Sequence, residues 1–294
     1  MSERYHITAV AWGKYTDKLA AISDKAAKLM QEYVLRYGFN VDDRMIEYAY
    51  SLATKYGEAA GELACAMYDD MVSYWNSSEY RKTLNKQVLE EDDELQKLRD
   101  LKYAEMAPTA TYEETAIAIR GTAKTSPTDI PSTVGRLVKQ TAADTTLQNA
   151  ARDGAEFAWI PGGNETCAFC MILASRGWQN ISKRTLRNGH AEHIHANCNC
   201  QYAVSRRGGE EYSDIYDPEE YLAFYEGVED YIDGPVNWRS RMNAMRRDIY
   251  AQNKDMINAQ KRAAYKRKQQ LDATDGKLPA KEAESPLWQD EYKA

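Results

Sequence analysis

Cysteine and histidine are concentrated in one short part of this 294-residue chain. Four of its five cysteines and three of its four histidines lie between Cys167 and Cys200. They form two groups, CAFC at 167–170 and HAEHIHANCNC at 190–200. Two ligand clusters joined by a loop are the arrangement that builds a tetrahedral metal site, because a turn within each cluster directs two side chains toward one point. The sequence therefore predicts a small unit stapled by a metal ion.

The two groups contain more donors than one ion needs. Zn²⁺ takes four sulfur or nitrogen ligands, and the CAFC cysteines supply one half of such a shell. Cys198, with either Cys200 or His195, is the preferred second half, whereas His190 and His193 are expected beside the site. A sulfur-rich shell leaves little Lewis acidity for water, so we expect a closed, structural Zn²⁺ site. The candidate ligands are Cys167, Cys170, His195, Cys198 and Cys200.

The composition predicts a globular protein kept in cytosol-like solution. Hydrophobic residues make up 43% of the chain, which is enough for a core. The sequence contains no run of about 18 uncharged apolar residues, so no membrane-spanning helix is expected. The N-terminal residues lack the apolar stretch of a signal peptide. A reducing compartment disfavours disulfides, so clustered thiols favour a metal. Cys65 stands apart and is predicted to be an ordinary buried side chain.

Charge is segregated near the C-terminal end of the sequence. Residues 206–235 hold ten acidic and two basic side chains, and residues 236–270 hold ten basic and two acidic ones. The two blocks either pair with each other or leave the basic one to meet an anionic surface such as a phosphate backbone. The candidate contacts are Arg239, Arg241, Arg246, Arg247, Lys261, Arg262, Lys266, Arg267 and Lys268.

Apolar residues at helical spacing dominate the N-terminal half. They predict a helix over 11–37 that stops at Gly38, and a second, long helix after the capping residues Asn40 and Asp42. Gly57 and Gly61 in that second helix predict close packing of a neighbour. Further helices are expected near 79–105 and 112–120, and the Pro-rich residues 125–132 predict a domain boundary.

The second half is predicted to begin with a helix capped by Ser132 and ended by Gly154, followed by strands at 157–160 and 200–205 around the cysteines. Residues 217–225 begin another helix, and 236–268 form a long basic helix with a narrow apolar seam. The fold class is thus mainly α, with an N-terminal helical bundle (1–124), a zinc-stapled α+β module (125–210), an acidic then basic helical region (211–270) and a flexible tail (271–294).

The motif region resembles a known family. The run CAFCMILASRGW, followed by HIHANCNC and a strand, resembles the C-terminal module of phage head morphogenesis proteins of the Mu protein F-like minor capsid family, in the form found in phages and prophages of Gram-positive bacteria. The matching positions are the five candidate ligands, and the resemblance covers about residues 130–205. Ala196 stands where that family usually has proline, and Asn199 where it usually has arginine.

This resemblance implies a structural virion protein rather than an enzyme. It implies a minor component at the portal vertex or capsid interior, present in the host cytoplasm during assembly, that aids head assembly or DNA packaging and delivery. Its partners would be portal or capsid proteins and packaged DNA bound without sequence preference. The alternative is a zinc-dependent nucleic-acid enzyme, an HNH-like nuclease that uses the same cluster with His193 or His195.

Overall fold

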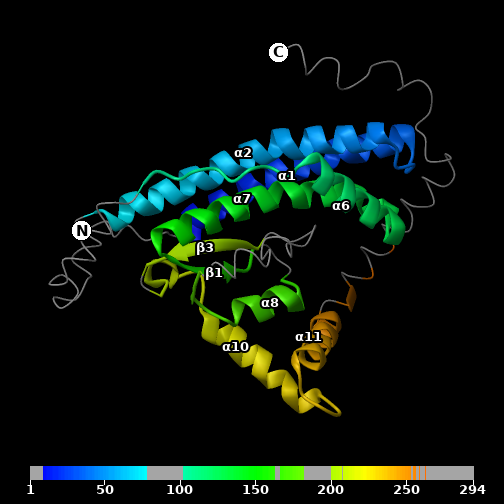
Figure 1. Cartoon of the computed structure of the whole chain (residues 1–294). Coiled ribbons are helices and arrows are strands. Elements are labelled where there is room, and N and C mark those ends of the chain that lie inside the picture. Colours follow the sequence, from blue (N-terminus) through cyan, green and yellow to red (C-terminus); the bar gives the residue numbers. More distant parts are fainter. Residues whose placement is uncertain are drawn as a thin grey trace.

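The computed structural model describes residues 9–77, 102–162, 166–181, 200–206 and 208–252, together with 254, 255, 258 and 262. It is mainly helical, as predicted. The long helices α1 (Ala9–Tyr37), α2 (Asp43–Trp75) and α7 (Ile130–Asp153) pack side by side, and α6 (Tyr112–Thr125) crosses one end of this bundle (Figure 1). A three-stranded sheet and three further helices lie on the other side of α7 from α2 (Figure 1).

The first two helices begin and end close to where the sequence predicts. Helix α1 stops before Gly38, whose φ is 82° and whose amide donates to the Val34 carbonyl at 2.9 Å. The Asp42 carboxylate caps α2 by accepting a hydrogen bond from the Met45 amide at 3.0 Å. Both ends therefore follow from local capping chemistry, in which a residue with left-handed backbone or a short polar side chain satisfies the terminal groups.

The predicted helix over 79–105 is wrong at its C-terminal end. Residues 78–101 lie outside the described part of the chain, but residues 102–111 form an extended segment, here called the strap, that runs along α2 to the start of α6 (Figure 1). Its backbone is bonded by side chains of the helices beneath it. Asn149 accepts from the Glu105 amide at 2.9 Å and donates to the Glu105 carbonyl at 2.8 Å. The Thr145 hydroxyl accepts from the Ala107 amide at 3.0 Å.

Close packing at the two glycines of α2 is confirmed. A Cβ at Gly57 would lie 3.0 Å from Thr141 Oγ1 of α7, and one at Gly61 would lie 2.5 Å from Met106 Cγ of the strap. Only a residue without a side chain lets both neighbours approach this near. The glycine pair therefore serves packing inside the bundle.

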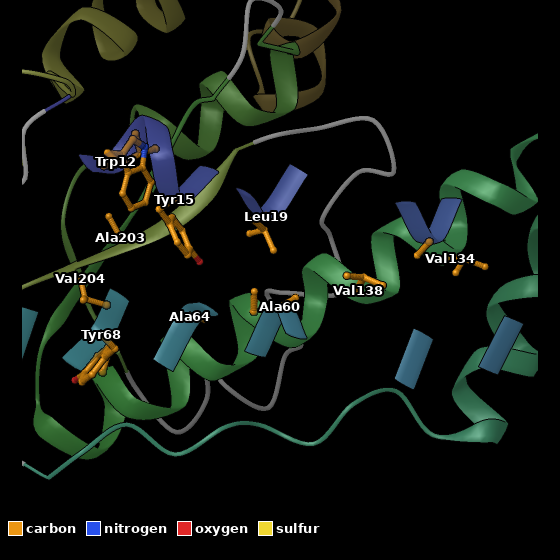
Figure 2. Close-up of a cluster of buried hydrophobic side chains, with 14 of the residues drawn as sticks. Trp12, Tyr15, Leu19, Ala60, Ala64, Tyr68, Val134, Val138, Ala203 and Val204 are labelled. Carbon is orange, nitrogen blue, oxygen red and sulfur yellow. The ribbon is translucent and has the colours of Figure 1, made fainter. Parts of the chain in front are cut away.

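The predicted boundary at residues 125–132 falls inside one hydrophobic core. Only the short 3₁₀ turn Pro127–Asp129 separates α6 from α7, and α7 starts at Ile130 rather than at a Ser132 cap. Figure 2 shows Leu19 of α1, Ala64 of α2 and Val138 of α7 in the same buried cluster as Ala203 of β3. The sheet of the predicted module thus packs directly on the bundle.

The sheet has the order β2-β1-β3 and is antiparallel throughout. Gly154, with φ of 65°, ends α7 and turns the chain into β1 (Glu156–Ile160), which pairs with β3 (Gln201–Ser205) in the register Trp159 to Tyr202. These two strands match the predicted strands. The short β2 (Gln179–Asn180), which the sequence did not indicate, pairs with the start of β1.

The remaining helices form an arm below the sheet (Figure 1). It consists of α8 (Ala168–Ala174), the 3₁₀ turn η3 (Glu210–Tyr212), α10 (Pro218–Gly227), the 3₁₀ turn η4 (Val228–Tyr231) and α11 (Trp238–Gln252). Met245 of the predicted apolar seam is buried and packs with Ile172 of α8 and Val228 of η4, and Ala244, which is not on that seam, is buried in the same cluster. Trp238, the large apolar residue at the start of the helix, is 54% exposed.

Candidate metal centre

The sheet presents a different set of side chains on each face. Because side chains alternate along a strand, Ala158 and Ala203 face the helical bundle, and Trp159 and Tyr202 face the opposite side. The Trp159 and Tyr202 rings meet edge to face with centroids 4.6 Å apart. This second face carries the cysteines.

Cys167 stands at the start of α8 as its N-terminal cap. Its backbone is extended (φ −76°, ψ 157°), and its Sγ accepts a hydrogen bond from the Cys170 amide at 3.4 Å. Cys170 itself is 1% exposed and packs among the side chains of the second face. The C-x-x-C motif therefore folds as a tight turn with both cysteines in one cluster, as the spacing predicts.

Cys200 joins the same cluster from the other end of the motif region. It immediately precedes β3, is fully buried, and lies on the sheet face of Tyr202 because the two residues are two positions apart. Its Sγ accepts a hydrogen bond from the Gly162 amide at 3.4 Å. Cys200 thus shares one apolar cluster with Cys167 and Cys170, although 30 or more residues separate it from them in the sequence. The cluster also contains Trp159, Phe157 and Leu147.

These sulfur atoms have the chemistry of metal ligands. No disulfide joins the cysteines that the structure describes, and backbone N–H groups donate to two of the sulfurs, which is an arrangement that stabilises thiolate charge. Thiolate sulfur is a type of donor that Zn²⁺ accepts. Within the described ranges, three or more Cys, His, Asp or Glu side chains are nowhere grouped as a metal site requires. His195 and Cys198 lie outside those ranges, so the choice of completing ligands stays a prediction.

Two tyrosines have pKa values that the nearby cysteines help to raise. Burial raises the pKa of Tyr202, and the nearby Asp144 carboxylate and Cys170 raise it further. Burial likewise raises the pKa of Tyr221 on α10, and Cys200 adds to that effect. Both phenols therefore stay protonated, and neutral, at neutral pH.

The basic residues that were predicted to contact an anionic surface differ in their surroundings. Arg239 and Arg246 are exposed, and the Arg239 guanidinium lies 5.3 Å from the centre of the neighbouring Trp238 ring. Arg247 donates to the Tyr231 carbonyl at 3.4 Å. Arg262 is also exposed, whereas Lys261, Lys266, Arg267 and Lys268 lie outside the described residues.

Arg241 differs from the prediction that these basic residues contact an anionic surface. Its side chain is 21% exposed, forms an ion pair with Glu229, and lies 4.5 Å from the centre of the Tyr225 ring. The acidic block and the basic block thus pair with each other at this position, which is one of the two alternatives that the sequence left open. Arg241 holds α11 to η4 and α10 instead of facing a ligand.

Sequence reasoning missed an open groove between α1 and α2. A cavity of about 390 Å³ is lined by Trp12, Tyr15, Met67 and Met71, with Lys14, Lys18 and Asp70 among its other lining residues. The sequence predicts only that the apolar side chains of these two helices recur at helical spacing and lie on packed faces. Periodicity cannot distinguish a side chain that packs against a neighbour from one that lines a groove, so no signal identified the cavity in advance.

Comparison with known proteins gives one family. A family model described as VG15 protein matches residues 6–228. No curated protein and no solved structure matches the chain. Across the part of the chain that the structure describes, every helix is too short or too polar to cross a membrane.

Proposed function

The chain belongs to the VG15 protein family, a family of phage proteins, and from this premise we propose that it is a structural minor capsid or head morphogenesis protein. In this proposal it acts at the portal vertex or the capsid interior and aids head assembly or DNA packaging and delivery. The resemblance of the CAFC and HIHANCNC segments to Mu protein F-like minor capsid proteins supports the same assignment.

The observation that supports the proposal is that Cys167, Cys170 and Cys200 belong to one apolar cluster on the outer face of the sheet, although the described residues alone do not form a metal-binding group. This face lies where the bundle joins the arm, because α8 contacts β1 on one side and α10 and α11 on the other. A Zn²⁺ ion held there by Cys167, Cys170 and Cys198, with either Cys200 or His195 as the fourth ligand, would supply a fixed cross-link between this end of β3 and α8. The protein's own groups provide the turn, the N–H donors and the apolar enclosure.

Such a centre suits assembly better than catalysis. A buried, cysteine-rich shell leaves no open coordination position for water, and its binding free energy contributes to folding. The bundle offers long helical surfaces to portal or capsid proteins, and the exposed Arg239, Arg246 and Arg262 offer positive charge to packaged DNA.

Purified phage particles test the location. We expect mass spectrometry to find the protein in few copies per particle, and particles from a deletion phage to be defective in assembly or DNA delivery. A protein confined to the soluble lysate, with normal particles in its absence, contradicts the proposal.

The nuclease alternative is tested with the purified, zinc-loaded protein and duplex DNA. The structural proposal predicts no cleavage. Cleavage that disappears in a His193→Ala or His195→Ala variant, while the circular dichroism spectrum is unchanged, establishes the enzyme instead.

A further inference from the structure

The groove between α1 and α2 is long enough to bind a short helix. Its lining runs from Ala11 to Lys18 on α1 and from Leu63 to Tyr74 on α2. At 1.5 Å per residue these stretches are about 10 Å and about 16 Å long. Its walls are largely aromatic and methionine side chains, which are adaptable surfaces for an apolar helix face.

Positive charge predominates at the edge of this groove. Lys14 and Lys18 are exposed, stand one turn apart on α1, and form no ion pair with a carboxylate that the structure describes. Asp70 of α2 is the acidic residue among those that line the groove. An occupant with an apolar stripe between carboxylates matches this pattern of charge.

Helix α10 of the same chain carries that pattern. None of its residues is buried, and its exposed residues Glu219, Leu222, Ala223 and Glu226 follow the spacing i, i+3, i+4, i+7. They therefore form one stripe with an apolar centre and an acidic residue at each end. Leu222 is 39% exposed although it is a large apolar side chain.

We propose that α10 of one copy docks into the α1–α2 groove of a second copy, with Leu222 entering the groove and Glu219 and Glu226 facing Lys14 and Lys18. The contact joins two copies because α10 packs on α8 and lies on the opposite side of α7 and the sheet from α2 (Figure 1). Two different surfaces meet, so the interaction is head to tail. Each pair keeps one open groove and one exposed α10, and further copies add to form a ring or a chain.

Sedimentation velocity of the full-length protein over a range of concentrations tests this proposal. The wild type is expected to pass from monomer to larger species as concentration rises, and less so at high salt. Leu222→Glu on α10 and Ala66→Glu in the groove each place a carboxylate in the contact. Either change should raise the dissociation constant about tenfold or more, because a buried leucine contact is lost or a carboxylate is buried.

Both substituted positions are exposed in the single chain, so the variants should fold normally. Ile117→Glu on α6, at a side chain that is 65% exposed and far from both surfaces in sequence, is the matched control and should associate like the wild type.

Mixing the two impaired variants separates a head-to-tail contact from any other. The Ala66→Glu protein keeps its α10 and the Leu222→Glu protein keeps its groove, so the mixture should form 1:1 dimers and nothing larger. A wild type that stays monomeric throughout, or a Leu222→Glu protein that associates like the wild type, overturns the proposal. A mixture that remains monomeric, or assembles beyond dimers, overturns the head-to-tail arrangement.

Discussion

Replacing Gly209 by alanine should destabilise the protein more than the same change at its neighbour Gly208. Both glycines have left-handed backbone, with φ of 84° and 62°. A Cβ at Gly209 would overlap the indole ring of Trp178, whereas a Cβ at Gly208 meets no atom within 4 Å. The left-handed conformation costs alanine about 1–2 kcal/mol at either position. Overlap with a packed ring adds about 1–3 kcal/mol at Gly209 alone.

Trp178 has little room to move away. Its ring contacts Tyr212 and Tyr216, with centroid distances of 5.3 and 6.2 Å, and Tyr212 is fully buried. Urea denaturation monitored by circular dichroism gives the free energy of unfolding for each variant. We expect Gly208→Ala to lose about 1–2 kcal/mol and Gly209→Ala to lose about 2–5 kcal/mol.

A double-mutant cycle identifies the cause. In a Trp178→Leu background the ring is absent, so the additional cost of Gly209→Ala should largely disappear. Equal losses for the two glycine variants, or a Gly209→Ala cost that is unchanged in the Trp178→Leu background, refute the reasoning about this contact.

Three further predictions concern other parts of the molecule. Glu211 is 2% exposed, accepts hydrogen bonds from Ser205 at 2.9 Å and Trp75 at 3.3 Å, and has a pKa that burial raises above its ordinary 4.5. The folded state therefore favours the protonated form, so stability should fall as pH rises from about 4.5 through the raised pKa. Glu211→Gln should remove that fall, and parallel pH–stability curves for variant and wild type contradict this account. Asn149→Ala removes both hydrogen bonds to Glu105 and should cost about 1–3 kcal/mol, with faster amide exchange across the strap; exchange there as slow as in the wild type counts against the strap's anchoring. Arg241→Ala breaks the ion pair with Glu229 and should cost about 1 kcal/mol with faster exchange in α11, whereas the exposed Arg246→Ala should leave stability unchanged; the reverse order contradicts the assignment of Arg241 to packing.

Local capping and periodicity predicted the bundle helices well. Asp42, Gly38 and Gly154 act through their own backbone and nearest neighbours, so their effects can be read directly from the sequence. The strands at 156–160 and 201–205 were found for a similar reason, since short apolar runs between turns are typical of strands.

The strap could not be predicted in this way. Its extended form depends on Asn149 and Thr145, which follow it by about 40 residues and bond its backbone from another helix. The Pro-rich stretch at 125–132 was predicted to be a domain boundary because its residue types are typical of linkers. Proline there is compatible with the first turn of α7, so residues typical of a linker instead start a helix of the bundle core.

Part of the candidate site was also visible in the sequence. The spacing of Cys167 and Cys170 predicted their tight turn, and Cys200 lies in the same apolar cluster, but the metal unit itself stays a prediction. The pairing of Arg241 with Glu229 was undecided, because charge blocks do not reveal which side chains point toward each other. The same holds for the groove, which exists only where two apolar faces leave space between them.

Zinc content is the measurement that tests the central claim most directly. The full-length protein, purified without chelators or added metal, is analysed by inductively coupled plasma mass spectrometry beside Cys167→Ser/Cys170→Ser and Cys65→Ser variants. Cys65 lies on α2, outside the cluster, and serves as the control. The account predicts one Zn²⁺ per chain in the wild type and the Cys65 variant, and loss of zinc with a lower melting temperature in the double variant. A wild type without bound zinc, or a double variant that keeps it, contradicts the account.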